Sequence, residues 1–384
     1  MKPFMFYSPV RVFFGVGGVE KVLPQELSKV GPTVMLAYGG GSIKRTGLYD
    51  QLCTLLQQAG KRIIDFGGIT SNPTYEKVLE GAQIVNQEQV DFILAVGGGS
   101  VVDGVKIIAA AAKAPKDLWE MEFEDHQFPT EGVPFGIVLT LSGTGAEMNA
   151  LAGITNEAQK RKTAVVGRYG EFSILDPTYL LTVPEKQLAA GIFDNLSHCM
   201  ETYFGRGNCV SDDMNEAVME NIVQNAMAWK QSPQDVNILG NLMWDSSIVQ
   251  SSILGLGKDS DFQCHSIEHQ LCAYTNCCHG MALAVIHPLY YKLVAKTAPE
   301  KFARFGQTVF GLDTSGSVEE QASQAIQALY EFIETLGLDH SFSQMGISVS
   351  QETLKTVAQT CGISNGALRT LTRDEVLQIL TEGL

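Results

Sequence analysis

Short apolar runs alternate with helical stretches through the first half of the chain. The runs are rich in β-branched residues, and glycines or a turn close each of them, which predicts the strands of a buried parallel sheet. The stretches between them have the apolar spacing of amphipathic helices, and this alternation predicts a doubly wound α/β layer. The predicted strands are Thr33–Tyr38, Arg62–Phe66, Asp91–Val96 and Phe135–Thr140, and the predicted helices are Thr46–Ala59, Pro73–Glu88 and Val101–Ala112.

The pattern changes after Asp176, where the strand signals end. Thr182-x-x-Glu185, with Pro184 between, predicts a capped helix start, and the apolar spacing is helical from there to Leu384. Its interruptions lie at Gly207–Asn208, Gly255–Asp261, Gly311–Gly316 and Gly346–Ile347. We therefore expect a Rossmann-like α/β N-terminal domain with a mostly parallel sheet over residues 1–183, and an all-α C-terminal domain over residues 184–384.

The composition and net charge of the chain argue against nucleic acid and membranes as binding partners. The 384 residues, 45% of them hydrophobic, are enough for a large core, and the net charge of −15 repels nucleic acid and anionic lipid surfaces. No apolar run approaches the length of a membrane span, and residues 1–14 lack the apolar core of a signal peptide. The eight cysteines are irregularly spaced without a C-x-x-C pair, which favours reduced thiols in a cytoplasmic protein.

Two of the predicted strands end in the same four residues, Gly39-Gly40-Gly41-Ser42 and Gly97-Gly98-Gly99-Ser100. Glycines let backbone N–H groups approach a phosphate, and a helix that follows adds partial positive charge at its N-terminus. A tight turn explains one such strand end equally well, but two in one sheet favour phosphate binding. Neither matches G-x-G-x-x-G or a Walker loop, so they do not identify the ligand. A third loop, Thr140–Glu147, offers hydroxyls and two glycines and suits a pyrophosphate or an amide.

The helical half contains a cluster of histidines and a carboxylate. Asp194 and His198 are four residues apart in one predicted helix and so project from one face. His265 and His269 repeat that spacing, and His279 follows at a Gly280 turn. One Asp-x-x-x-His pair is usually a helix-surface pair, but the joint pattern favours a divalent metal such as Zn²⁺ or Fe²⁺. The residues alone do not decide which three or four are ligands.

Together, these segments resemble the iron-containing (group III) alcohol dehydrogenase family, most closely its NADPH-dependent butanol dehydrogenase or aldehyde reductase branch. The resemblance covers nearly the whole chain. The similar segments are Phe14-Gly15-Val16-Gly17, Gly97–Lys106, Thr140–Asn149, Asp194–His198, His265–His269 and His279-Gly280.

The resemblance implies a metal-dependent alcohol dehydrogenase or aldehyde reductase that acts on small primary alcohols and aldehydes, with its active site in a cleft between two domains. It implies that Asp194, His198, His265 and His279 hold Fe²⁺ or Zn²⁺. His269 is then not a ligand, and by resemblance lies beside the nicotinamide and the substrate, where its imidazole could relay a proton. Asp103 is the second residue for which we expect a catalytic contribution.

The same resemblance assigns the three loops to NADP(H), with NAD(H) as the alternative cofactor. Relatives that use NAD often have an acidic residue after the first strand, where Gly40, Gly41 and Ser42 stand here. A carboxylate would repel a 2′-phosphate, whereas Ser42, Lys44 and Arg45 could accept it. The expected cofactor-binding residues are Gly39, Gly40, Gly41, Ser42, Gly97, Gly98, Gly99, Ser100, Asp103, Lys106, Thr140, Leu141, Ser142, Thr144, Asn149, Lys162 and Leu181.

Two other functions fit parts of the pattern: a glycerol dehydrogenase-like, NAD-dependent polyol dehydrogenase, and a non-catalytic sensor of metal and nucleotide. A dehydroquinate synthase would need a dense set of basic residues, and the segment His265–His279 contains no Lys or Arg. We also expect a homodimer, because the edge-like strand Arg11–Phe14 would offer backbone groups to a second copy.

Overall fold

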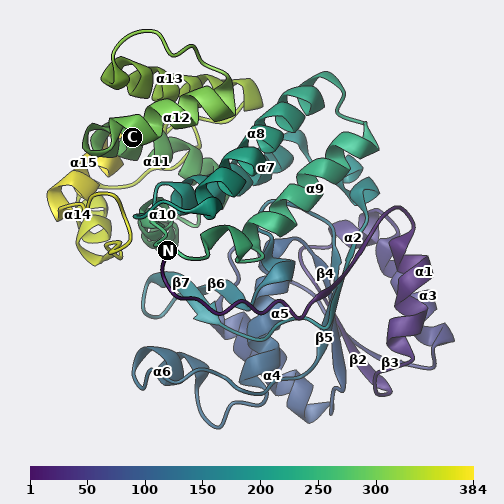
Figure 1. Ribbon diagram of the computed structural model, residues 1–384. Coiled ribbons are helices and arrows are strands. Elements are labelled where there is room, and N and C mark those ends of the chain that lie inside the picture. Colours follow the sequence, from purple (N-terminus) through teal and green to yellow (C-terminus); the bar gives the residue numbers. More distant parts are fainter. The chain divides into compact units, whose positions relative to one another are not determined.

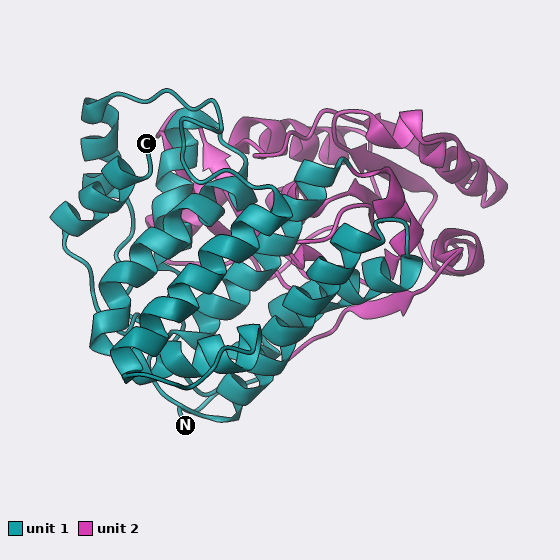
Figure 2. Ribbon diagram, turned by 90° about the horizontal axis from the view of Figure 1, so that it is seen from above, with its two compact units in different colours: residues 1–6, 184–384 teal, residues 7–183 magenta.

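The computed structural model describes residues 1–384, which form two compact units. One unit is Tyr7–Val183, and the other combines Met1–Phe6 with Pro184–Leu384 (Figure 2). The first six residues were expected in the α/β domain but pack with the helical unit. There, the backbone N–H of Lys2 donates to the carbonyl of Gly257 at 2.8 Å, and its ammonium pairs with Asp259.

The α/β unit is built on a six-stranded sheet in the order β1-β8-β5-β4-β2-β3, with all neighbours parallel. Its strands are β1 (Arg11–Phe14), β2 (Thr33–Tyr38), β3 (Arg62–Phe66), β4 (Phe92–Gly97), β5 (Phe135–Leu139) and β8 (Phe172–Leu175). Four of these strands match the predicted apolar runs. The doubly wound, parallel architecture is therefore confirmed.

Helices cover both faces of this sheet (Figure 1). On one face, α1 (Gly18–Leu27) and α3 (Leu48–Gln58) pack on alternate side chains of β2 and β4 in one apolar cluster. On the other side lie α4 (Tyr75–Gln87) and α5 (Gly99–Ala111). The remaining helical segments of this unit are α2 (Ser42–Arg45), α6 (Leu118–Phe123), η1 (Ala146–Met148) and η2 (Pro177–Thr182).

A small antiparallel hairpin, absent from the prediction, pairs β6 (Leu151–Asn156) with β7 (Arg161–Val166) outside the main sheet. Its connection contains no glycine or proline, and Lys160 adopts a positive φ of 49° there. Because glycine and proline are the strongest turn signals, this hairpin had none of the usual sequence marks.

The second unit is helical throughout, as predicted. Its helices are α7 (Glu185–Tyr203), α8 (Val210–Gln231), α9 (Val236–Gln250), η3 (Ile253–Gly255), α10 (Gln263–Thr275), α11 (His279–Val294), η4 (Ala295–Thr297), α12 (Pro299–Phe310), α13 (Val318–Leu336), α14 (Gln351–Thr360) and α15 (Arg373–Glu382). No helix in the chain is long and apolar enough to cross a membrane.

The start of α7 differs in detail from its prediction. Pro184 is the N-cap residue, and no side chain caps the helix. The Thr182 hydroxyl, expected to cap α7, donates to the carbonyl of Tyr179 instead. Pro184 still sets the start, because a proline ring disfavours helical backbone at the residue before it, and Val183 is extended with a ψ of 132°.

Candidate metal centre and cofactor loops

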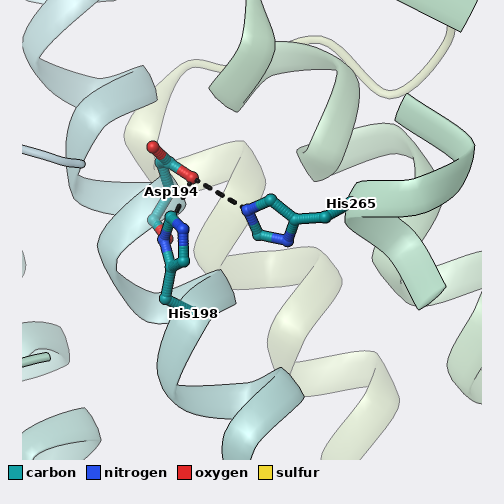
Figure 3. A group of neighbouring side chains, drawn as sticks. All are labelled: Asp194, His198 and His265. Atoms are coloured by element: carbon teal, nitrogen blue, oxygen red, sulfur yellow. Dashed lines mark hydrogen bonds and ion pairs between the residues drawn. The ribbon is translucent and has the colours of Figure 1, made fainter. Parts of the chain in front are cut away.

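Three helices of the helical unit bring the four expected metal ligands together. Asp194 and His198 lie one turn apart on α7, and His265 reaches toward them from the first turn of α10 (Figure 3). His279 is the first residue of α11. The four side chains come from three separate segments of the sequence, so only the packing of α7, α10 and α11 brings all four together.

Oδ1 of Asp194 is the atom that these side chains share. It lies 3.7 Å from Nε2 of His265 and 3.5 Å from Nε2 of His279. A tetrahedral site with bonds of about 2.1 Å places its donor atoms roughly 3.4 Å apart, so these separations suit a bound divalent ion. One ligand atom from each of Asp194, His198 and His265 also lies within 4.8 Å of the others.

Three buried atoms of these side chains have no hydrogen-bond partner, namely Oδ1 of Asp194, Nε2 of His265 and Nδ1 of His279. A buried polar atom left this way is costly, and a cation between Oδ1 of Asp194 and Nε2 of His265 would satisfy both of those atoms. Nδ1 of His198 lies 2.8 Å from the carbonyl oxygen of Asp194, which leaves Nε2 of that ring for a metal. One carboxylate and three imidazoles fit Zn²⁺ or Fe²⁺.

Burial and neighbouring charges set the protonation state of each expected ligand. Burial opposes the charge of Asp194, but His198, His279 and His265 outweigh it and lower its pKa to about 2. Burial lowers the pKa of His198 to about 4, so this ring is neutral at physiological pH. Burial also opposes a charged His265, yet Glu201 and Asp194 together raise its pKa to about 10. Metal binding at His265 would therefore displace a proton.

Gly280 places His279 beside α7. A Cβ atom at this position would lie 2.2 Å from the carbonyl oxygen of Ala190 on α7, so only glycine allows the two backbones to approach this closely. The Gly280 turn noted in the sequence is thus a helix–helix contact that brings His279 within reach of Asp194.

His269 occupies the turn of α10 after His265 and is partly exposed. Its Nε2 lies 4.0 Å from Oε2 of Glu268, and its ring centroid is 5.6 Å from that of His279. His269 thus lies next to the four expected ligands. The histidine whose Nε2 lies beside Oδ1 of Asp194 is His279, at 3.5 Å.

Sequence reasoning missed two buried glutamates in this cluster. Oε2 of Glu201 contacts Nδ1 of His265, and Oε2 of Glu268 lies 2.6 Å from Nδ1 of His279. A signal was available, because Glu201 follows Asp194 by seven residues, two turns along the same face of α7, and Glu268 follows His265 by three.

The first glycine loop is open. A Cβ atom at Gly39 would lie 3.1 Å from the carbonyl oxygen of Ile69, but a Cβ atom at Gly40 or Gly41 would meet no heavy atom within 4 Å. Gly41 has a φ of 92°, and Ser42 begins the four-residue helix α2. Packing within the protein therefore does not require glycine at Gly40, and the space beside it is available to a ligand.

The second glycine loop is closely packed. A Cβ atom at Gly98 would lie 2.9 Å from Leu141, and one at Gly99 would lie 1.9 Å from Oγ1 of Thr144. Gly98 caps α5 without any side-chain hydrogen bond, so the helix presents its first N–H groups at the carboxyl end of β4. Glycine here brings the loop after β5 against the start of α5.

Other expected cofactor residues hold these loops in place. The fully buried ammonium of Lys106 donates to Asn149 Oδ1 at 2.9 Å and to the carbonyl of Leu151 at 2.6 Å, and it pairs with Asp103 at 3.4 Å. Asp103 also accepts from the N–H of Gly153 at 2.9 Å. Further contacts join Lys162 to Asn72 and the Ser100 hydroxyl to the carbonyl of Ser71. Thr140 follows β5, Ser142 is buried in the loop after it, and Leu181 lies in η2.

Comparison with known proteins covers both units. Residues 9–177 match the family of iron-containing alcohol dehydrogenases, and residues 188–384 match the C-terminal part of the Fe-containing alcohol dehydrogenase family. The NADH-dependent butanol dehydrogenase A of Clostridium acetobutylicum is 35% identical over 386 residues, with 99% of each chain covered. The NADPH-dependent aldehyde reductase YqhD of Escherichia coli is 32% identical over 359 residues, with 91% of each covered.

Solved structures agree with these matches. The crystal structure of NADH-dependent butanol dehydrogenase A from Thermotoga maritima superimposes with a TM-score of 0.92 at 32% identity, over 100% of this chain and 99% of that one. The strand order, the helical second unit and the sequence similarity over its full length together show that this chain belongs to the iron-containing alcohol dehydrogenase family.

Proposed function

We propose that this protein is a metal-dependent alcohol dehydrogenase or aldehyde reductase that transfers a hydride between NAD(P)H and a small primary alcohol or aldehyde. The observation that carries the proposal is the cluster around Oδ1 of Asp194, where Nε2 of His265 and Nε2 of His279 lie within 3.7 Å and a ligand atom of His198 lies within 4.8 Å. Family membership supports the same reaction, since the similar proteins named above are butanol dehydrogenases and an aldehyde reductase.

Asp194, His198, His265 and His279 would hold Fe²⁺ or Zn²⁺. When bound, either ion supplies Lewis acidity, which polarises an aldehyde oxygen or stabilises an alkoxide. The chain contributes the arrangement of the ligands, since α7, α10 and α11 fix four side chains in a buried environment. His269, beside the ligands and partly exposed, is the group proposed to move a proton between the alcohol oxygen and solvent.

The α/β unit would bind the cofactor. The open space at Gly40 and Gly41, the uncapped N-terminus of α5 and the loop Thr140–Asn149 all lie at the carboxyl ends of parallel strands, where doubly wound sheets bind their ligands. Asp103 and Lys106 would seat the cofactor by holding that loop against α5.

NADP preference is a finer part of the proposal. It is supported by the absence of a carboxylate between Gly39 and Arg45. The ammonium of Lys44 lies over the rings of Tyr38 and Tyr49, 4.7 and 4.5 Å from their centroids, and so adds a fixed positive charge beside this loop. The similar proteins include NADH-dependent and NADPH-dependent enzymes, so the choice must be measured on this chain.

A panel of small aldehydes and alcohols, assayed with NADPH and with NADH on protein of known metal content, tests the function directly. The proposal expects NADPH-dependent reduction of short aldehydes, with the metal content tracking the activity. Stoichiometric NADPH binding without turnover of any member of the panel would instead favour the non-catalytic sensor, and a preference for polyols with NAD would favour a polyol dehydrogenase.

A further inference from the structure

Two of the histidines at the candidate metal centre each lie between two carboxylates. His265 faces Asp194 with Nε2 at 3.7 Å and contacts Oε2 of Glu201 with Nδ1. His279 faces Asp194 with Nε2 at 3.5 Å and has Nδ1 at 2.6 Å from Oε2 of Glu268. The side chains of both glutamates are fully buried. Each ring therefore has a glutamate beside its Nδ1, and its Nε2 faces Asp194.

Glu201 is well fixed for this purpose. Its Oε1 accepts the backbone N–H of Cys264 at 2.6 Å and that of His265 at 3.4 Å, at the start of α10. That helix has no side-chain cap of its own, because its N-cap residue is Phe262. One carboxylate on α7 thus anchors both the first turn of α10 and the ring that this turn carries.

Glu268 connects α10 to α11. Its Oε2 lies 2.6 Å from Nδ1 of His279, although the two atoms are not aligned as a hydrogen bond in this structure. Its Oε1 accepts a weak hydrogen bond from the thiol of Cys277 at 3.8 Å, just before α11 begins. Since α11 packs closely on α7 at Gly280, Glu268 lies where it can orient the His279 ring.

The cluster contains three buried carboxylates, whose ion-pair contacts are with histidines. Asp194 and Glu201 contact histidines in this way, and Glu268 contacts His269 and His279. Buried carboxylates are costly unless positive charge compensates them. A divalent ion at Asp194 would compensate the charge and leave each glutamate free to accept an Nδ1–H.

We propose that Glu201 and Glu268 are positioning residues for the metal centre. Glu201 already contacts Nδ1 of His265, and Glu268 stands beside Nδ1 of His279; in the metal-bound protein each accepts the Nδ1–H of its histidine and so fixes the tautomer in which Nε2 carries the lone pair. Carboxylates that hold metal-ligating histidines in this way orient the ring and raise its basicity, and losing one typically weakens metal binding roughly 10- to 100-fold. The inference rests on the proposed metal centre and adds two residues that do not themselves touch the ion.

The test compares Glu201→Gln and Glu268→Gln with the wild-type protein, and with Asp245→Asn as a matched control. Asp245 is also a buried carboxylate of the helical unit, but its hydrogen bonds come from Asn221. Affinity for Zn²⁺ is measured by competition with a chromophoric chelator. The visible spectrum of the Co²⁺-loaded protein, which depends on ligand geometry, gives a second readout, and the thermal stability of the metal-free variants a third.

We expect Zn²⁺ affinity to fall roughly 10- to 100-fold in each glutamine variant, with an altered Co²⁺ spectrum, and to stay within about twofold in Asp245→Asn. The loss should be larger at Glu201, because both of its oxygens accept N–H groups and an amide offers only one acceptor. If Glu201→Gln does not fold, Glu268→Gln carries the test.

Two results would overturn the inference in distinguishable ways. A wild-type protein that binds no Zn²⁺ or Co²⁺ stoichiometrically would remove the metal centre and this inference together. Stoichiometric binding in the wild type, with affinity and spectrum unchanged in both glutamine variants, would leave the metal centre in place and reduce the two glutamates to a purely structural role.

Discussion

Replacement of glycine by alanine should have different effects on stability at Gly99 in the second Gly-Gly-Gly-Ser segment and at Gly40 in the first. At Gly99 a Cβ atom would lie 1.9, 2.7 and 2.8 Å from three side-chain atoms of Thr144, closer than side chains pack. At Gly40 it would meet nothing within 4 Å. Gly99→Ala must therefore displace the loop after β5 or the start of α5, whereas Gly40→Ala has open space.

The magnitude follows from overpacking, which typically costs about 1–3 kcal/mol. Alanine is a better helix former than glycine by up to about 1 kcal/mol, so part of this cost is offset at the start of α5. We expect Gly99→Ala to destabilise the protein by about 1–2 kcal/mol, a fall in Tm of a few degrees for a unit of this size. Gly40→Ala should be neutral or slightly stabilising, since it mainly restricts the unfolded chain.

Thermal or denaturant unfolding of both variants checks these values, and Thr144→Gly completes a double-mutant cycle. Because Thr144→Gly removes all three contacting atoms, Gly99→Ala should cost less in that background, with a coupling of about 1 kcal/mol or more. Gly40→Ala should instead raise the KM for the cofactor while leaving stability intact. Equal stability of Gly99→Ala and Gly40→Ala, or costs that simply add in the cycle, would refute this reasoning.

Three further predictions concern the cofactor, pH and assembly. Ser42→Asp should lower the ratio of kcat/KM for NADPH over NADH roughly ten- to a hundredfold by repelling the 2′-phosphate, and Ser42→Asn is the uncharged control. Gly41 is unsuitable for this substitution because its φ of 92° would strain any side chain. An unchanged ratio in Ser42→Asp would mean that the loop is misassigned. Burial raises the pKa of Asp245 to about 6 from its ordinary 3.8, so the native state binds this proton more tightly than the unfolded chain does, and stability should fall as pH rises from about 4 to 6. Asp245→Asn should flatten that part of the stability profile by up to about 3 kcal/mol, and an unaltered profile measured by urea unfolding would contradict the assignment. β1 is an edge strand with β8 on one side, and Phe14 at its end is 50% exposed. We therefore predict that light scattering detects a homodimer and that Phe14→Lys weakens it, whereas a monomeric wild type at micromolar concentration would exclude the dimer.

The sequence predicted the middle of the sheet well because β2, β4 and β5 are buried on both faces, which produces continuous apolar runs such as Thr33–Tyr38. It missed β8, which has only four residues, and the hairpin of β6 and β7, whose turn contains neither glycine nor proline. The packing of residues 1–6 on the helical unit depends on contacts with Gly257 and Asp259, and nothing local in the sequence indicates such contacts.

The candidate site was predictable only in part for a similar reason. Helical spacing placed Asp194 with His198, and His265 with His269, but it could not relate α7 to α10 and α11. Only the resemblance to the family separated His279 from His269, and the structure supports that choice through the 3.5 Å between His279 and Asp194. The close approach at Gly280, which creates this distance, depends on a backbone contact with Ala190.

The most direct test of the account is a metal titration of chelator-treated wild-type protein and of His265→Ala, followed at each point by NADPH oxidation with a short aldehyde. The account predicts that the wild type regains activity in proportion to bound Fe²⁺ or Zn²⁺ up to one ion per chain. His265→Ala should bind neither ion tightly and stay inactive while it still binds NADPH, because the ligands belong to the helical unit. Full activity in the metal-free protein, or stoichiometric metal in His265→Ala, would contradict it.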